Sequence, residues 1–152
     1  MKAVNIYLNF EGNTEDAFNF YKSIFGGEFI GGIMRFRDFP PMEDMEDVPP
    51  LKEQEKDLVG HVSLPLTEHA TLMGTDISSN MPEKLIVGNN IQITLEAGNA
   101  AEAESLFVKL SEGGRVVMPL KEMFWAEKYG ACVDKFGIYW QINYTGNMAA
   151  DS

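Results

Sequence analysis

The sequence indicates an acidic, globular protein. Its 152 residues carry a formal net charge of −11, and 45% of them are hydrophobic, enough for a packed core. This charge argues against nucleic acid and anionic membranes as partners, because the chain could not neutralise rows of phosphates. The single cysteine, Cys132, excludes a disulfide framework and a cysteine-rich metal site. We find neither a cleavable leader nor an apolar run near the ~20 residues of a membrane span, so we expect a cytoplasmic protein.

The chain opens with a predicted strand and a predicted helix. Residues 3–10 alternate apolar and polar side chains, as a half-buried strand does. Thr14 is the expected N-cap of a helix that ends at Gly26-Gly27. The apolar stripe expected to face the core consists of Ala17, Phe20, Tyr21, Ile24 and Phe25.

Three further strands are expected in the first half, at 28–37, 58–66 and 69–76, and the last two should form a hairpin. The intervening residues 38–57 hold four of the seven prolines and eight acids. Such a segment cannot form a sheet ladder, and we expect a long, solvated loop. It is either a flap over a site or a disordered insert.

The same order of elements restarts after a turn-rich linker at 78–88. Asn99 is the expected helix N-cap, and a loop is expected at Pro119. The predicted strand, helix and three strands span 90–96, 100–112, 115–118, 128–133 and 138–144.

The last strand follows a predicted tight turn, Asp134-Lys135-Phe136-Gly137. One face of this strand is apolar, and the other carries Tyr139, Gln141 and Asn143. Amides beside a tyrosine are unusual for a plain surface, so this face is a candidate cavity wall.

An internal repeat is the strongest inference from the pattern. Modules at about 1–77 and 89–146 share the order strand–helix–strand–strand–strand, and Asn5-Ile6-Tyr7-Leu8 matches Asn90-Ile91-Gln92-Ile93. Neither module has enough surface to bury a sheet face alone. The predicted fold is α+β: two βαβββ modules forming curved mixed sheets with a concave cavity, and helices on the outside.

The arrangement resembles the vicinal oxygen chelate superfamily, which includes glyoxalase I, extradiol dioxygenases and bleomycin-resistance proteins. The motifs that resemble its PhnB-like branch are Phe124-Trp125-Ala126-Glu127, Tyr129-Gly130, Asp134-Lys135-Phe136-Gly137, Trp140-Gln141-Ile142-Asn143, Phe25-Gly26-Gly27 and Leu72-Met73-Gly74-Thr75-Asp76. Some PhnB-like proteins carry a ubiquinone-related methyltransferase label. This sequence does not support that label, because it has no strand followed by a Gly-rich, nucleotide-binding loop.

The resemblance also implies where a metal would bind, through the first and last strands of each module. Those positions hold Asn5, Met73 or Gly74, Asn90 and Gln141. Amides supply neither the anionic charge nor the imidazole nitrogen that holds a transition metal tightly. We therefore expect no metal and no other cofactor.

The function expected from these residues is metal-independent small-molecule binding in the cavity between the modules, with no catalytic residue identified. The candidate ligand-binding residues are Asn5, His61, Asn90, Trp125, Tyr129 and Gln141. The resemblance implies a homodimer. One alternative is a metal-dependent lyase, isomerase or dioxygenase, in which His61, Glu127 and Glu11 would converge. The other is an interaction module that uses the acidic loop at 43–57.

Three chemically versatile residues have simpler interpretations. Cys132 lies in a predicted strand and is expected to behave as a small buried hydrophobe. His69 follows a turn and is expected at the surface. Glu127 is a candidate acid or base, but an ion-paired or solvated role is the simpler prediction.

Overall fold

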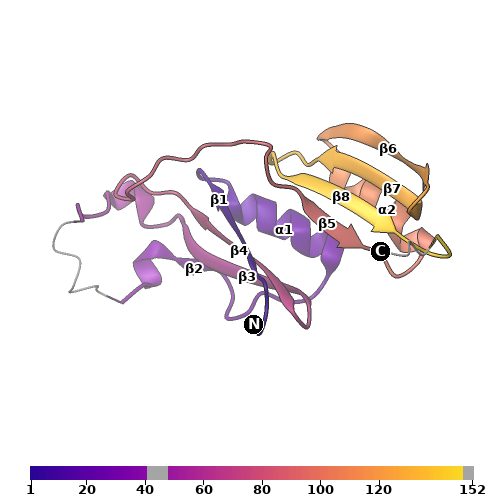
Figure 1. Cartoon of the computed structure of the whole chain (residues 1–152). Coiled ribbons are helices and arrows are strands. Elements are labelled where there is room, and N and C mark those ends of the chain that lie inside the picture. Colours follow the sequence, from indigo (N-terminus) through magenta and orange to yellow (C-terminus); the bar gives the residue numbers. More distant parts are fainter. Residues whose placement is uncertain (41–47, 149–152) are drawn as a thin grey trace. The chain divides into compact units, whose positions relative to one another are not determined.

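The computed structural model describes residues 1–40 and 48–148. The chain divides into two compact units, Met1–Ile86 and Val87–Ser152, each with one long helix and a four-stranded mixed sheet (Figure 1). The predicted α+β class and the βαβββ order of both halves are confirmed. In the described part of the chain, no helix is long and apolar enough to span a membrane.

The first unit has the strand order β1-β4-β3-β2. Strand β1 runs parallel to β4, and the other neighbours are antiparallel. The elements are β1 (Ile6–Phe10), α1 (Thr14–Phe25), β2 (Met34–Arg35), the 3-10 helices η1 (Phe36–Asp38) and η2 (Glu53–Glu55), β3 (Val59–Thr67) and β4 (Ala70–Asp76). The predicted hairpin is therefore present as β3 and β4.

Helix α1 packs across β3 and β4 and buries an aromatic core (Figure 1). Phe18, absent from the predicted stripe, is fully buried along with Tyr21. Phe18 fits because Gly74 lacks a side chain: a Cβ there would lie 2.4 Å from the Phe18 ring. The predicted stripe was therefore rotated slightly away from the true buried face.

The start of α1 also differs from the prediction. Asn13, not Thr14, is the N-cap residue, and its side chain makes no capping bond. Thr14 is buried, and its amide and hydroxyl both donate to the Asp76 carboxylate, at 3.1 and 2.6 Å. Asp76 also accepts from the amides of Gly12 and Val59, both at 2.9 Å. One buried carboxylate thus joins the helix start to β3 and β4.

The strand predicted at 28–37 is mostly wrong. Only Met34–Arg35 forms a strand, because Gly31 and Gly32 both have positive φ and turn the chain before it. Phe36 then begins η1.

The second unit repeats the order as β5-β8-β7-β6. Its elements are β5 (Ile93–Glu96), α2 (Ala100–Ser111), β6 (Arg115–Met123), β7 (Ala126–Val133) and β8 (Tyr139–Tyr144). The predicted cap is confirmed, since the Asn99 side chain accepts from the Glu102 amide at 2.8 Å. The loop predicted at Pro119 is wrong: β6 continues through it as an edge strand, which tolerates the missing N–H of proline.

The core of the second unit is built on β8. Trp140 and Ile142 are fully buried, which confirms the predicted inner face of this strand. The turn before it also forms: Gly137 has φ +91° and donates to the Asp134 carbonyl. The Asp134 side chain accepts from the Trp140 indole at 2.8 Å, so the turn also orients the largest core residue.

The repeated order of elements is present in both units. Leu8 pairs with Gly74, and Leu95 pairs with Ile142, on the helix-facing side of each sheet. Asn90 precedes β5, whose predicted start was too early.

Candidate functional site

Each sheet has one face covered by its helix and one face that the helix leaves uncovered, here called the open face. In the first unit the open face carries Tyr7, His61, Ser63, Met73 and Thr75. Alternation along β3 and β4 places them opposite the buried Leu64, Leu72 and Gly74. Between the two residues considered for the metal position, Met73 is therefore the one on the open face.

His61 lies at the centre of a short chain of polar contacts on this face. Its Nδ1 is 3.4 Å from the Tyr7 hydroxyl, and its Nε2 is 2.8 Å from the Ser63 hydroxyl. The rings of Tyr7 and His61 lie 5.8 Å apart, centre to centre. Burial raises the pKa of the Tyr7 phenol, and the Thr75 hydroxyl partly opposes that shift. Tyr7 is therefore a neutral hydroxyl near pH 7.

A cavity of about 520 Å³ adjoins this chain, and we call it the first-unit cavity. It is lined by Tyr7, Phe36, Phe39, Pro40, Val48, Pro49, Pro50, Leu51, Gly60, Thr75, Ser78, Asn80, Met81 and Pro82. None of these lining residues carries a charged side chain. The rings of Phe36 and Phe39 meet edge to face, 5.7 Å apart.

One wall of the cavity is held by two segments far apart in sequence. The Glu55 carboxylate accepts from the Ser79 amide at 2.6 Å and from its hydroxyl at 2.5 Å. The Asn80 amide donates to the Pro49 carbonyl at 3.1 Å. Hydrogen bonds from Ser79 lower the pKa of Glu55, so this connection is intact at neutral pH.

The acidic stretch 38–57 is thus not simply a solvated loop. Residues 48–51 contribute to the wall, and η2 follows them. This placement favours the flap interpretation over the disordered insert. Residues 41–47, with part of the proposed contact at 43–57, lie outside the described residues.

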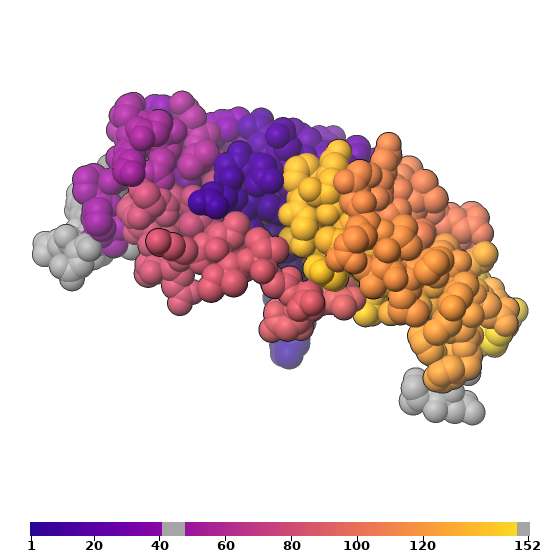
Figure 2. Space-filling view, turned by 90° about the horizontal axis from the view of Figure 1, so that it is seen from above, coloured from indigo at the N-terminus to yellow at the C-terminus, as the bar shows by residue number. Residues whose placement is uncertain are grey.

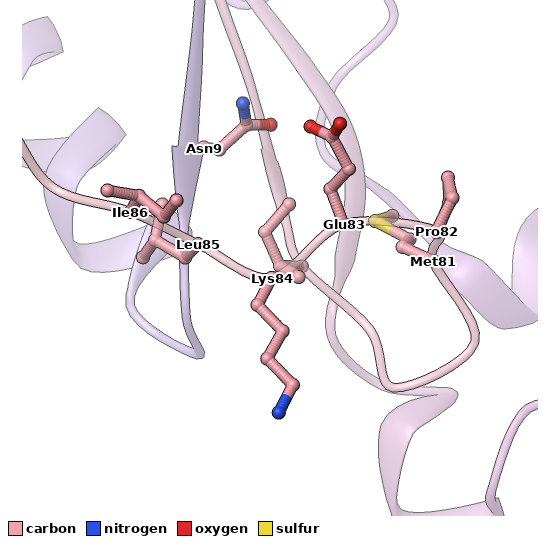
Figure 3. Close-up of a pocket in the computed structure, with 8 residues that line it drawn as sticks. Asn9, Met81, Pro82, Glu83, Lys84, Leu85 and Ile86 are labelled. Atoms are coloured by element: carbon pink, nitrogen blue, oxygen red, sulfur yellow. The ribbon is translucent and has the colours of Figure 1, made fainter.

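A second hollow, of about 490 Å³, lies beside β1 and is lined by Asn9 and the segment 77–86. In Figure 3 the Lys84 ammonium points away from Asn9 and Glu83. Figure 2 shows the segment, rose in the colour bar, at the surface of the first unit. Glu83, Lys84 and Ile86 are exposed, so this hollow encloses a ligand less well than the first-unit cavity.

The open face of the second unit carries a row of paired amides. Gln141 accepts from the Thr94 hydroxyl and donates to the Gln92 side chain, both at 2.9 Å. Asn143 donates to the Glu96 carboxylate at 2.6 Å, while its own Oδ1 is buried without a partner among the described residues. Burial alone would raise the pKa of Glu96, but hydrogen bonds from Asn143 and Thr145 lower it overall.

Aromatic residues continue this face toward β6. Trp125 and Tyr129 meet edge to face at 5.3 Å, and Phe124 packs on Trp125 at 4.7 Å. Phe124 itself is 87% exposed. Two of the predicted ligand-binding residues, Trp125 and Tyr129, are therefore in contact with each other.

The other predicted site residues are less closely grouped. The Asn5 side chain accepts from the Thr71 amide at 3.2 Å, and this exposed residue lies just before β1. Glu127 accepts from the Asn147 amide at 3.0 Å, and so secures the turn after β8 instead of acting as an ion pair. Glu11 is exposed. Within residues 1–40 and 48–148, no three His, Cys, Asp or Glu side chains are grouped to hold a metal ion.

Two of the simpler interpretations are confirmed. Cys132 is fully buried, and burial together with the Asp134 charge raises the pKa of its thiol to about 11. The His69 side chain is 74% exposed. Sequence reasoning missed the first-unit cavity itself, although Phe36, Phe39 and the apolar residues beside Pro49-Pro50 were visible signals.

Comparisons with known proteins agree with this architecture. Residues 2–143 match the family model described as 3-demethylubiquinone-9 3-methyltransferase. Protein YjdN of Escherichia coli K12 is 28% identical over 141 residues, which cover 90% of this chain and 91% of that protein.

Solved structures give the same result. Protein PA1353 from Pseudomonas aeruginosa is 34% identical, with a TM-score of 0.75 over 93% of this chain and 96% of that one. A Bacillus cereus PhnB protein, titled a putative 3-demethylubiquinone-9 3-methyltransferase, is 26% identical, with a TM-score of 0.64 over 93% and 98%. A glyoxalase/bleomycin resistance protein/dioxygenase family enzyme from Burkholderia phytofirmans shares the fold, at 13% identity and a TM-score of 0.57 over 95% and 97%. The chain therefore belongs to the 3-demethylubiquinone-9 3-methyltransferase family, as a PhnB-like protein with the glyoxalase/bleomycin-resistance fold.

Proposed function

We propose that this protein binds a small molecule in the first-unit cavity and needs no metal to do so. The cavity itself carries the proposal. Its volume of about 520 Å³ lies within the usual range for ligand sites, about 300–1,000 Å³. Its walls combine aromatic and proline rings with a few hydroxyl and amide groups, as such sites usually do.

The chemistry of the open face supports metal independence. Beside the cavity it offers one imidazole, His61, together with hydroxyls and the Met73 thioether. Transition metals in proteins are held by several imidazole, thiolate or carboxylate groups. Both nitrogens of His61 already have hydroxyl partners.

Methyl transfer, named in the family description, is not part of this proposal. The chain enters its two helices through Glu11-Gly12-Asn13 and Ala97-Gly98-Asn99. Each junction has one glycine, whereas a nucleotide-like cofactor is usually held by a Gly-rich loop after a strand. The enzymatic and acidic-loop alternatives stay predictions.

A fragment screen tests the proposal directly. Neutral and charged fragments would be screened by thermal shift with and without a chelator, against wild type, Phe39→Ala and Phe124→Ala. Phe39 lines the cavity, whereas Phe124 is an exposed aromatic on the other unit and serves as the matched control. We expect hits that survive the chelator and are lost only in Phe39→Ala. Hits that need added metal, or that are equally strong in Phe39→Ala, would contradict the proposal.

We also propose that the protein is a homodimer. Large apolar side chains are exposed on the single chain, and apart from Met1 the most exposed of them are Ile86, Val87, Ile91 and Phe124. Exposed apolar surface of this kind often marks an interface. Light scattering should give twice the mass of the chain, 17.0 kDa. A monomer at micromolar concentration would overturn this part.

The cytoplasm is the proposed location. Cys132, the one cysteine, is a free and buried thiol, which suits a reducing compartment. Fractionation of cells expressing the full chain should recover it with cytoplasmic markers. Recovery with membrane or exported material would count against this location.

A further inference from the structure

We propose that the first-unit cavity selects a planar aromatic molecule that hydrogen-bonds to the Tyr7 hydroxyl, and that it rejects anions. This inference rests on the proposed function and adds the chemical class of the ligand. Three observations carry it: the shape of the walls, the lack of a charged side chain among the described lining residues, and the described lining hydroxyl that is best placed to bond a ligand.

The walls suit a flat ligand. The rings of Phe36 and Phe39 stand edge to face, and three prolines, Pro40, Pro49 and Pro50, add further flat apolar surface. Aromatic rings stack or meet edge to face with gains beyond their area, about 0.5–1.5 kcal/mol per pair. Gly60 leaves room for these rings, because a Cβ at this position would lie only 2.7 Å from the Phe39 ring.

The charge of the site argues against an anion. The cations nearest to Phe36 in the chain are already paired: Arg35 with Glu15 at 2.8 Å, and Arg37 with Asp57 at 2.5 Å. Lys52 follows the lining residue Leu51, but it acts on Glu55, whose pKa it helps to lower. A buried anion without a cationic partner is strongly disfavoured.

Elimination identifies the polar anchor. The Ser78 hydroxyl donates to Asn80 at 2.5 Å, and the Asn80 amide is bonded to Pro49. The Thr75 hydroxyl lies within 3.2 Å of the Val59 carbonyl. Tyr7, in contrast, has a long 3.4 Å contact with His61 and an interaction with the Thr75 hydroxyl, and its side chain is about half exposed where it lines the cavity. It is the lining hydroxyl best able to bond a ligand.

Three probes with one ring system test the selection: 2-naphthol, 2-naphthyl phosphate and naphthalene-2-sulfonate. Their affinities would be measured by calorimetry for wild type, Tyr7→Phe, Phe39→Ala and two controls in the second unit, Tyr144→Phe and Phe124→Ala. We expect 2-naphthol to bind at least about tenfold more tightly than either anion. Tyr7→Phe should weaken 2-naphthol about fivefold, as the loss of one hydrogen bond does. Circular dichroism would verify that each variant is folded.

The outcomes separate the two proposals. If an anion binds as tightly as 2-naphthol, and Phe39→Ala weakens both, the charge selection is wrong while the cavity still binds small molecules. If Tyr7→Phe has no effect on 2-naphthol, the anchor is wrong. If no probe binds, or Phe39→Ala leaves binding unchanged, both the inference and the proposed site fail.

Discussion

The two units have the same strand order but different solutions to the same packing problem. In the first unit, Gly74 on β4 makes room for Phe18 of α1, and Gly74 pairs with Val62 of β3. In the second unit, Gly130 on β7 makes room for Phe107 of α2, and Gly130 pairs with Ile142 of β8. The glycine has exchanged strands with its large partner. Each unit thus places a glycine beneath an aromatic ring of its helix, but on a different strand.

The helix starts differ as well. Helix α2 is capped locally by Asn99, and the Glu102 carboxylate accepts from the Gly98 amide at 3.1 Å. Helix α1 is capped from a distance by Asp76, at the end of β4. A local cap depends on neighbouring residues, whereas the distant cap ties the helix to the sheet. This difference predicts a different sensitivity to mutation in each unit.

The largest effect is expected at the distant cap. Asp76→Ala removes four hydrogen bonds to a buried carboxylate and leaves their donors unpaired, which should cost about 3 kcal/mol of unfolding free energy. Asp16→Ala, on the exposed side of α1, is the control and should change stability by less than about 0.5 kcal/mol. Urea denaturation would measure both. A loss below about 1 kcal/mol for Asp76→Ala would show that the distant cap is dispensable.

The next effect concerns the glycine beneath each helix. Gly74→Ala should cost about 2 kcal/mol, because its Cβ would meet the fully buried Phe18. Gly130→Ala should cost less, since Phe107 is only half buried and can give way. Phe18→Leu would provide space, so a double-mutant cycle with Gly74→Ala should show favourable coupling. If the losses of stability in the two single variants simply add up in the double variant, the contact with Phe18 is not the cause of the Gly74→Ala effect.

A smaller effect separates the two N-caps. Asn99→Ala should cost about 1 kcal/mol, the usual value of a capping side chain. Asn13→Ala should change stability by less than about 0.5 kcal/mol, because Asn13 makes no side-chain cap bond. Thermal or urea unfolding of the pair gives the comparison. Equal losses would mean that Asn13 does cap α1 in solution.

A pH dependence, with no effect on stability at neutral pH, is expected in the second unit. The Cys132 thiol has a folded pKa of about 11, above the unfolded value of about 8.5. Its contribution to stability is therefore complete below about pH 8.5 and declines as pH rises toward 11. Wild type should lose stability over this range more steeply than Cys132→Ala. Parallel curves would indicate that the thiol titrates normally.

Much of the fold was predictable because it depends on local pattern. Alternation along β8 identifies its buried face, and the two glycines after α1 mark the end of that helix. The turn at Asp134 also forms as expected. Phe18 and Thr14 were misplaced because their positions depend on Gly74 and Asp76, some 60 residues away in the chain. Helical periodicity has no access to such contacts.

The candidate site was less predictable than the fold. The chain of polar contacts through His61 joins β1 and β3, and alternation along β3 puts His61 and Ser63 on one face. Asn90 was expected to begin a strand, but β5 begins only at Ile93. The first-unit cavity could not be predicted, because its wall depends on the contacts of Glu55 with Ser79 and of Asn80 with Pro49. These residues are distant in sequence, and hydrophobic periodicity does not reveal such contacts.

Mapping a bound probe by NMR tests the central claim most directly. The full-length, isotope-labelled protein would be titrated with 2-naphthol while the backbone amides and the two tryptophan indoles are followed. We predict shifts concentrated at Tyr7, Phe39 and the amides of 78–81, with the Trp125 indole unchanged. Shifts confined to Trp125, Tyr129 and Gln141, or no shifts at saturating probe, would contradict the account.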